Sequence, residues 1–153
     1  MKNDSSPIDD DLASALAGHV NGIIRALLVA GRQGAPAEGR IPFNPLYFNI
    51  LRTLGADGPC RPSFIADRLA VPRTTMSTAI KALTRKKLIT TSVDEADRRA
   101  TALSLSAGGQ SVLDAILRQD LRNATAMLTI LDKEERAAFV AAIGKVATGI
   151  SAE

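Results

Sequence analysis

The apolar residues of this chain change their spacing once, between residues 88 and 105. Before and after this segment they recur at steps of three and four residues, which predicts amphipathic helices. Within it, the run 88–93 is short and rich in β-branched residues, and the run 101–105 alternates polar and apolar residues. Because the charged segment 94–100 separates the two runs, they predict a β-hairpin with a charged tip. The expected fold class is therefore mainly α-helical with one small hairpin.

Six helices are predicted from the spacing and from the signals at their ends. Asn44 is suited to cap the second helix, and Pro45 to take its first position, where a missing N–H costs nothing. Ser106 can cap the fifth helix, while Asp132 and Glu135 form a capping-box pair that opens the sixth. The second helix is expected to stop at the Gly- and Pro-containing segment 55–59. The predicted ranges are about 9–32, 45–54, 62–69, 73–86, 106–128 and 132–150.

The third and fourth predicted helices are separated only by Ala70, Val71 and Pro72, which favour a tight turn. A short helix, a turn, a second helix and then a hairpin make a winged helix-turn-helix. The residues expected to face its core from these two helices are Phe64, Ile65, Leu69, Met76, Ile80 and Leu83. The opposite face of the fourth helix would then be free to contact a partner.

That opposite face combines short hydroxyl side chains with cations, the groups that read base edges and bind phosphate in a major groove. The predicted major-groove contacts are Arg73, Thr74, Thr75, Ser77, Thr78 and Lys81. Phosphate contacts are expected from Ser63, Arg68 and Arg85. Taken alone, serines and threonines on a helix face are ordinary solvent-facing residues. Their position between a proline turn and a basic hairpin favours DNA contact.

The hairpin tip carries Arg98 and Arg99, and arginines placed there can enter the narrow minor groove of DNA. The alternative is that they are ordinary charges of a solvent-exposed loop. Charge distribution favours the first interpretation, because residues 61–100 hold nine basic and four acidic side chains in a chain of net charge +3. A basic middle segment suits a module that binds a polyanion.

These motifs resemble the MarR family, the multiple-antibiotic-resistance type of bacterial regulators. The residues that carry the resemblance are Gly58-Pro59, Ile65–Leu69, Thr74–Ser77, Ala82-Leu83, Lys87–Ile89, Asp97–Arg99 and Leu105–Gly109. The resemblance implies a homodimeric transcriptional regulator of the repressor type that binds a near-palindromic site on double-stranded DNA. It also implies that Asp97 supports the wing through a salt bridge, and it allows a small-molecule effector that the sequence does not identify.

Two positions depart from the family pattern. Lys87 stands where the family usually has glycine, and Thr90 and Thr91 replace an arginine that is common after the start of the first strand. The geometry of the turn and one phosphate contact are left open by these departures.

The long helices at the two ends carry apolar stripes larger than a small winged lobe can cover, which invites association. The alternative is that they complete a monomeric core. We expect dimer contacts from Leu12, Leu16, Val20, Phe139, Ile143 and Val146. The expected organisation is a disordered tail at 1–8, a dimerisation region at 9–34 and 106–153, and a winged helix-turn-helix lobe at 43–105.

Enzyme chemistry is not expected, because no paired acid and base, activated nucleophile or phosphate-binding loop is present in the sequence. The single histidine, His19, has no partners at metal-ligand spacing, so no metal or other cofactor is predicted. It is interpreted as a surface or dimer-interface residue. Cys60 is the only cysteine and is expected to be a packing residue rather than a redox sensor.

A cytoplasmic protein without a membrane partner is expected. The N-terminal segment is polar and acidic, unlike a signal peptide, and apolar runs such as the one interrupted by Arg25 are shorter than a membrane span. The competing hypothesis for function is a winged-helix adaptor that binds proteins and has lost DNA binding. Such an adaptor would usually lack wing arginines and carry an apolar face on its recognition helix, and neither change is found in this sequence.

Overall fold

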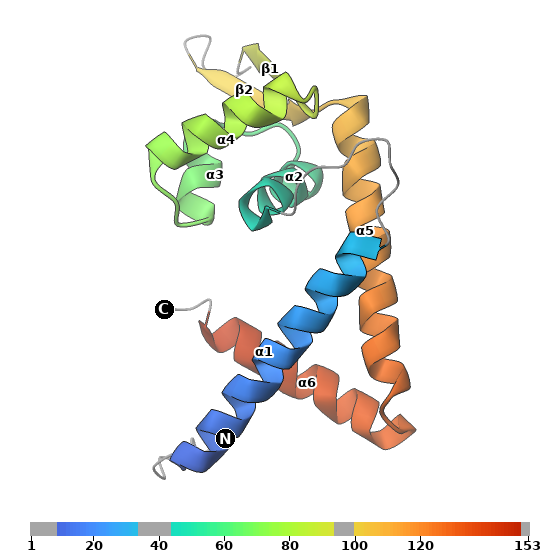
Figure 1. Ribbon diagram of the computed structural model, residues 1–153. Helices are drawn as coiled ribbons and strands as arrows, with labels where there is room; N and C mark the ends of the chain where they lie inside the picture. The colour runs from blue at the N-terminus through green and yellow to red at the C-terminus, as the bar shows by residue number, and fades with distance from the viewer. Residues whose placement is uncertain (1–8, 34–43, 94–99, 151–153) are drawn as a thin grey trace. The chain divides into compact units, whose positions relative to one another are not determined.

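The computed structural model describes residues 9–33, 44–93 and 100–150, with side chains from 9 to 29 in the first of these ranges. Within them it contains six α-helices and a two-stranded antiparallel sheet, which confirms the expected fold class (Figure 1). The elements are α1 (Asp10–Gln33), α2 (Pro45–Asp57), α3 (Pro62–Arg68), α4 (Arg73–Arg85), β1 (Ile89–Val93), β2 (Thr101–Leu105), α5 (Ala107–Thr129) and α6 (Lys133–Ile150). The chain divides into two units, residues 1–40 and 41–153.

The start of α2 is set by its cap, as predicted. The Asn44 side-chain oxygen accepts hydrogen bonds from the N–H groups of Leu46 and Tyr47, at 3.0 and 3.3 Å, and Pro45 occupies the first turn. These contacts satisfy two of the N–H groups that a helix start leaves without partners.

α2 stops within the predicted segment 55–59, but it continues past Leu54 to Asp57. Gly55 lies inside the helix, where a Cβ atom would come within 2.3 Å of a methyl carbon of Leu113 on α5. This glycine therefore serves a close approach of two helices rather than a turn. The helix ends at Gly58, whose φ of 74° favours glycine and whose N–H bonds to the Leu54 carbonyl at 3.2 Å.

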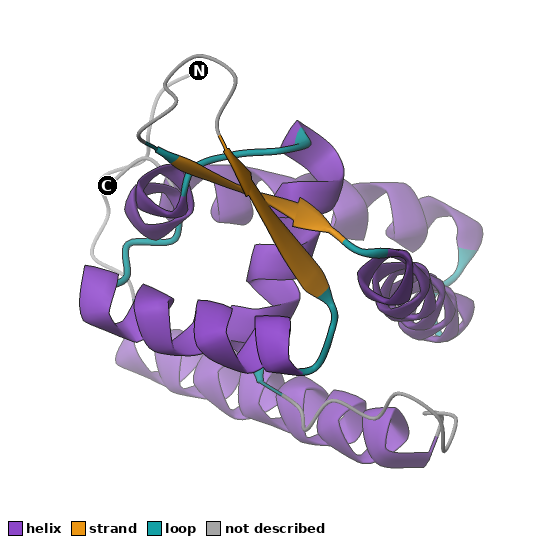
Figure 2. Ribbon diagram, turned by 90° about the horizontal axis from the view of Figure 1, so that it is seen from above, coloured by secondary structure: helices purple, strands orange, loops and turns teal. Residues whose placement is uncertain are grey.

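The core of the second unit lies between α2, α3, α4 and the sheet (Figure 2). The buried residues of this cluster are Ile50, Leu51, Leu54, Ile65, Ala66, Met76, Ala79, Leu83, Leu88, Ile89 and Leu103. Burying a leucine, isoleucine or methionine side chain contributes roughly 1.5–3 kcal/mol, so this cluster supplies a large favourable term in the folding of the lobe.

One predicted core residue is not in the core. Phe64 remains 45% exposed, whereas its neighbours Ile65 and Ala66 are buried. The inward positions of α3 are 65, 66 and 69, which share one face of a helix with about 3.6 residues per turn. Phe64 precedes that face by one position. Ile80 of α4 is only partly buried at the edge of the cluster.

The two strands pair over their full length, from Ile89 opposite Leu105 to Val93 opposite Thr101. Cys60 adds a short bridge to the other edge of β2: its N–H bonds to the Leu103 carbonyl at 3.1 Å and its carbonyl accepts from the Leu103 N–H at 2.9 Å. The wing is therefore tied to the segment that leads into α3.

The turns after α3 and α4 have the same geometry. Ala70 comes just after α3 and Lys87 just after α4. Both residues have a positive φ, 51° for Ala70 and 57° for Lys87, which is the left-handed conformation found at a Schellman helix end. After α4, the Lys87 N–H bonds to the Thr84 carbonyl at 2.9 Å and the Leu88 N–H to the Leu83 carbonyl at 3.0 Å. Glycine takes this conformation without cost, whereas other residues pay roughly 1–2 kcal/mol. The departure from glycine at position 87 thus leaves the turn intact but strained.

The start of α5 rests on the turn that follows α4. The Ser106 hydroxyl accepts from the Gly109 N–H at 2.9 Å and donates to the Lys87 carbonyl at 2.6 Å. The Ser106 N–H bonds to the Leu88 carbonyl at 3.0 Å. Ser106 therefore acts as the predicted cap and also fastens α5 to the α4–β1 turn.

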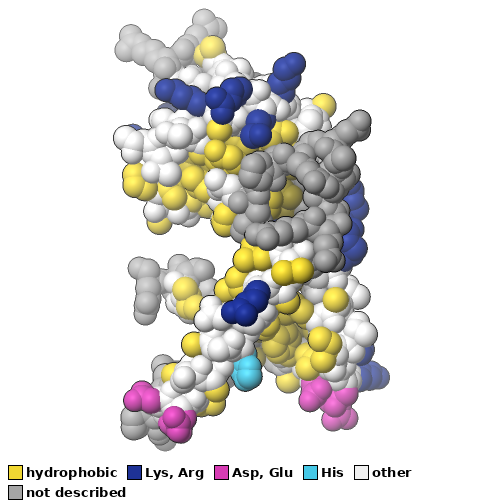
Figure 3. Space-filling view, in the orientation of Figure 1, with side chains coloured by type: hydrophobic (Ala, Val, Ile, Leu, Met, Phe, Trp, Pro, Cys, Tyr) yellow, Lys and Arg dark blue, Asp and Glu magenta, His cyan; other side chains and the backbone are white. Residues whose placement is uncertain are grey.

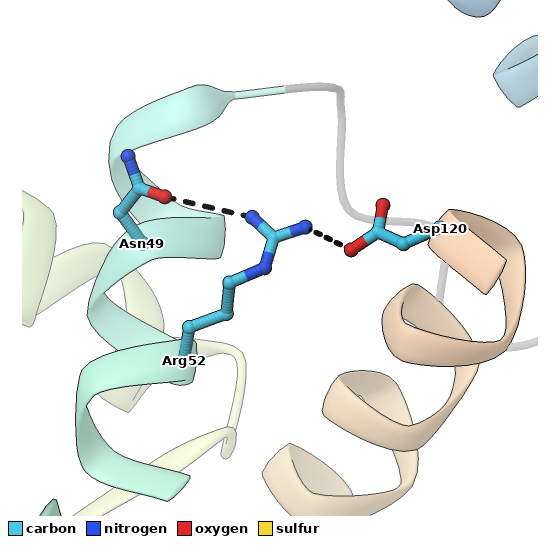
Figure 4. A network of polar contacts seen from close by, with 3 residues as sticks. All are labelled: Asn49, Arg52 and Asp120. Carbon is cyan, nitrogen blue, oxygen red and sulfur yellow. Dashed lines mark hydrogen bonds and ion pairs between the residues drawn. The ribbon is translucent and has the colours of Figure 1, made fainter. Parts of the chain in front are cut away.

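Further along, α5 is joined to α2 by a polar contact on the surface (Figure 4). A guanidinium nitrogen of Arg52 lies 2.5 Å from a carboxylate oxygen of Asp120, and the other terminal nitrogen lies 3.5 Å from the Asn49 side-chain oxygen. Arg52 and Asp120 are 37% and 51% exposed, so water and salt screen their attraction.

Replacing Asp120 by asparagine is therefore expected to lower the free energy of unfolding by less than ~1 kcal/mol. Urea unfolding measured at low and at high salt tests this, since the small difference from wild type should shrink as salt rises. A loss well above that value, unchanged by salt, would show that the pair is more important to the fold than its exposure implies.

The sixth helix opens with the predicted capping box. The Asp132 carboxylate accepts from the N–H groups of Glu134 and Glu135, both at 2.9 Å, and the Glu135 carboxylate accepts from the Asp132 N–H at 2.9 Å. No described residue of α6 is buried. Its apolar side chains Val140, Ile143, Val146 and Ile150 are all more than half exposed.

The apolar residues of α1 are also exposed, led by Leu12 at 68% and Leu16 at 63%. Within Asp10–Val29, the most apolar run of 18 residues has a mean hydropathy of 1.5, and the helix is long and apolar enough to cross a membrane. The expectation that every apolar stretch is too short is therefore wrong for this helix, because interruptions such as Arg25 do not lower its average enough. One such helix near an N-terminus is weak evidence for a span.

Candidate nucleic-acid interface

The outer face of α4 is a continuous polar arc. Met76, Ala79 and Leu83 form its buried stripe. At about 100° per residue, the exposed positions 73, 77, 81 and 84 follow one another on the opposite side, with 74, 78 and 85 beside them. Lys81 lies nearly opposite the middle of the buried stripe. All the predicted major-groove residues are exposed, and only Thr75 lies at the margin of the arc.

The hydroxyl groups on this face are not equally free. The Thr78 hydroxyl donates to the Thr74 carbonyl at 3.1 Å, one turn back in the same helix. A hydroxyl used in this way keeps its acceptor capacity but no longer offers its proton. Thr74, Thr75 and Ser77 are therefore the better candidates for donating to a base edge.

The first turn of α4 has backbone N–H groups available. Pro72 occupies the cap position and no side chain in the described structure caps this helix. The N–H groups of the first turn of a helix attract anions, because they lack partners and carry the positive end of the helix dipole. This end of α4 can therefore meet a phosphate group, with the exposed Arg73 side chain beside it.

The predicted phosphate contacts have different surroundings. Ser63 is half-buried in the first turn of α3, and Arg85 is exposed at the end of α4. Arg68 lies with one guanidinium nitrogen 3.4 Å from a carboxylate oxygen of Asp57. Because this pair is largely open to solvent, it is weak, and Arg68 can still face an anion.

Cations gather where α4 ends. Lys81, Arg85, Lys86 and Lys87 are exposed, and none of them has an ion pair with a described carboxylate. Figure 3 shows Lys and Arg side chains over the part of the lobe formed by α4 and the hairpin. The acidic residues of the same unit that this view shows gather at the turn between α5 and α6. The lobe thus presents a positive surface around α4.

The wing residues Asp97, Arg98 and Arg99 lie outside the described residues. Their predicted roles remain predictions. The register of the hairpin ends with Val93 opposite Thr101, so the segment 94–100 joins the far ends of the two strands.

Sequence reasoning did not single out Thr84 as part of this face. Thr84 could have been found from helical periodicity alone. The left-handed conformation of Lys87 had one signal, its place where glycine is usual, but the signal could not say whether the turn would change or the residue would be strained.

Cys60 is half-buried and packs against the core cluster, as expected for a packing cysteine. Burial raises the pKa of its thiol above the ordinary value, and the Asp57 carboxylate raises it further, against an opposing effect of Arg68. A raised pKa keeps the thiol protonated at neutral pH and lowers its reactivity. Among the described residues no cluster of His, Cys, Asp and Glu could hold a metal ion.

The helix-turn-helix of α3 and α4 followed by a two-stranded wing defines a winged-helix domain. Residues 41–100 match the model of the MarR family, so this domain is a MarR-family domain, as the sequence motifs predicted. Proteins of that family are transcriptional regulators. No sequence among the curated proteins matches the chain.

Solved structures extend the likeness to nearly the whole chain. A MarR family protein from Bacillus stearothermophilus is 16% identical with a TM-score of 0.76, over 95% of this chain and 99% of that one. The YusO protein from Bacillus subtilis is 22% identical with a TM-score of 0.71, over 90% and 93%. BpsR of Bordetella bronchiseptica, whose DNA binding is regulated by 6-hydroxynicotinic acid, is 20% identical with a TM-score of 0.64, over 87% and 98%. At such identities the likeness concerns the fold.

Proposed function

We propose that this chain is a homodimeric, sequence-specific DNA-binding regulator of transcription that acts as a repressor on a near-palindromic double-stranded site. The observation that carries the proposal is the outer face of α4. In a MarR-family winged-helix domain, this face offers hydroxyl groups and cations that pair with no described carboxylate, on the side opposite the residues that anchor the helix in the core. It has the groups that a major groove requires: donors and acceptors for base edges and cations for phosphates.

Dimerisation is supported by the apolar side chains that the single chain leaves exposed on its long helices. They include Leu12, Leu16 and Val20 on α1, Leu117 and Leu121 on α5, and Ile143 and Val146 on α6. A monomer rarely exposes so much apolar surface. Regions 9–34 and 106–153, including the half-buried Phe139, would then pack against a second copy, and the lobe 43–105 would contact DNA. A partner subunit, rather than lipid, would cover α1 in a cytoplasmic protein.

A small-molecule effector is part of the proposal because of the likeness to BpsR, whose DNA binding 6-hydroxynicotinic acid regulates. A ligand that binds the free form better than the DNA-binding form would lower the affinity for the operator by the ratio of its two affinities.

The competing function, a protein-binding adaptor, would need an apolar patch on the outer face of α4. That face is polar at every exposed position from Arg73 to Arg85. Nothing in the described structure favours the adaptor over a DNA-binding protein. An enzyme is not proposed, because the family consists of regulators and the site offers cations and hydroxyls without a paired base.

The test is binding to double-stranded DNA selected from a random pool, followed by fluorescence anisotropy at several salt concentrations. Each phosphate contact should make log K fall by about 0.9 per tenfold rise in salt. Light scattering of the free protein should give twice the mass of one chain. A monomer with no affinity for any duplex in dilute buffer would overturn the proposal.

A further inference from the structure

Lys87 combines a strained backbone with a charge that pairs with no described carboxylate. It adopts φ 57° in the turn after α4, a conformation that glycine takes freely and that a side chain makes costly. Residues held in such conformations persist only where the surrounding structure fixes them, and they cluster at functional sites.

The backbone of Lys87 is held from both sides. Its N–H bonds to the Thr84 carbonyl at 2.9 Å, and its carbonyl accepts from the Ser106 hydroxyl at 2.6 Å. The first turn of α5 lies against the same carbonyl, because a Cβ on Gly108 would approach it to 3.3 Å. These contacts among α4, β1 and α5 thus impose the left-handed conformation, whatever side chain occupies position 87.

No described carboxylate compensates for the charge of a lysine at this position. The side chain is exposed, has no ion pair with a described carboxylate, and follows the exposed cations Arg85 and Lys86 directly in the sequence, with Lys81 one to two turns earlier on α4. Like charges this close repel one another, which adds to the cost. In the free chain, glycine would be the better residue here.

We propose that Lys87 is a phosphate-contact residue. Its ammonium group would bind a phosphate of the DNA backbone at the turn between α4 and β1, where the helix meets the wing. The proposal rests on the proposed DNA-binding function. A phosphate would offset the repulsion among the four cations, and its binding would release counterions. The unfavourable free energy of Lys87 in the free protein would therefore be offset when DNA binds. Lys87 would act on affinity for any sequence, not on the choice of sequence.

Lys87→Gly tests the proposal with two readouts that move in opposite directions. Glycine removes the backbone strain at position 87, which should raise Tm by about 2–4 °C in a chain of this size. Loss of the contact should weaken duplex binding at low salt and reduce the slope of log K against log salt by about 0.9 for each subunit, or about 1.8 in a dimer.

Three control variants separate the causes. Ala70→Gly relieves the same strain after α3 without removing a charge, so Tm should rise and the salt slope should stay. Lys87→Gln removes the charge but keeps a side chain in the strained conformation, so the slope should fall while Tm rises less than in Lys87→Gly. Lys133→Gln removes an exposed lysine at the start of α6 and should leave the slope unchanged.

The outcomes are distinguishable from a failure of the proposed function. If wild type binds duplex DNA with a clear salt dependence but Lys87→Gly and Lys87→Gln keep its slope, the assignment of Lys87 is wrong. If wild type binds no duplex at all, the proposed function fails. If Lys87→Gly lowers Tm, the cation stabilises the end of α4 in the free protein, and the argument from uncompensated strain fails.

Discussion

Replacing Gly109 by alanine is expected to lower the free energy of unfolding by at least ~3 kcal/mol, more than an ordinary overpacked side chain costs. A Cβ at this position would lie 1.9 Å from the Leu88 carbonyl oxygen and 2.9 Å from the Leu88 carbonyl carbon. Both atoms belong to the backbone and cannot rotate away as a flexible side chain can. The same carbonyl accepts the Ser106 N–H at 3.0 Å, so moving it would also break the bond that fastens α5 to the lobe.

Urea unfolding followed by circular dichroism measures this effect. The control is Gly144→Ala, because Gly144 lies inside α6 with nothing within 4 Å of its added Cβ. Alanine is favoured over glycine in a helix interior by up to ~1 kcal/mol, so this variant should be as stable as wild type or more stable. Since domains of this kind have only about 5–15 kcal/mol of stability in total, the two variants should differ widely. Equal unfolding midpoints would contradict the close approach of α5 to the α4–β1 turn.

The local parts of the fold could be predicted from the sequence, and the reason is that they depend on a few neighbouring residues. Asn44, Ser106 and Asp132 cap the helices that the sequence assigned to them. The hairpin was predicted from a change of period that only a pleated strand explains. Each of these signals is complete within about five residues.

The errors concern contacts between residues far apart in the chain. Gly55 was taken for a helix end because glycine is common there, but its role is to admit Leu113 of α5. Phe64 was expected in the core because it is large and apolar, yet the seven-residue α3 has room to bury only the face of Ile65. Neither outcome is encoded in the neighbouring sequence, because both depend on which element packs nearby.

The candidate site was predictable to a similar extent. Helical periodicity placed the hydroxyl groups and Lys81 on one exposed face, since Met76 and Leu83 fix the buried one. Periodicity could not show that the Thr78 hydroxyl bonds back to its own helix or that Arg68 lies near Asp57. The Thr78 hydrogen bond depends on the rotamer of its side chain, and the Arg68–Asp57 pair depends on how α3 packs beside the end of α2. The strained turn at Lys87 likewise follows from its bonds to Ser106, nineteen residues further along the chain.

Replacing Lys81 by glutamate is expected to weaken duplex binding about 100-fold. Lys81 lies at the centre of the exposed arc of α4, so it would contact bases or phosphates if this face enters a major groove. Losing one cationic contact costs roughly 1–3 kcal/mol, and a carboxylate at the same place adds repulsion. Since a homodimer carries the change twice, a loss of about 1.4 kcal/mol in each subunit, or tenfold, multiplies to that figure.

Fluorescence anisotropy with the selected operator and with an unrelated duplex measures the effect at fixed salt. Lys145→Glu is the matched control, because it makes the same charge reversal at an exposed position of α6. It changes the net charge equally, so any general repulsion from DNA appears in both variants and cancels in their comparison. Both variants should unfold like wild type, since Lys81 has no ion pair with a described residue. If the two reversals weaken binding equally, the protein responds only to its total charge, and α4 is not the helix that enters the groove.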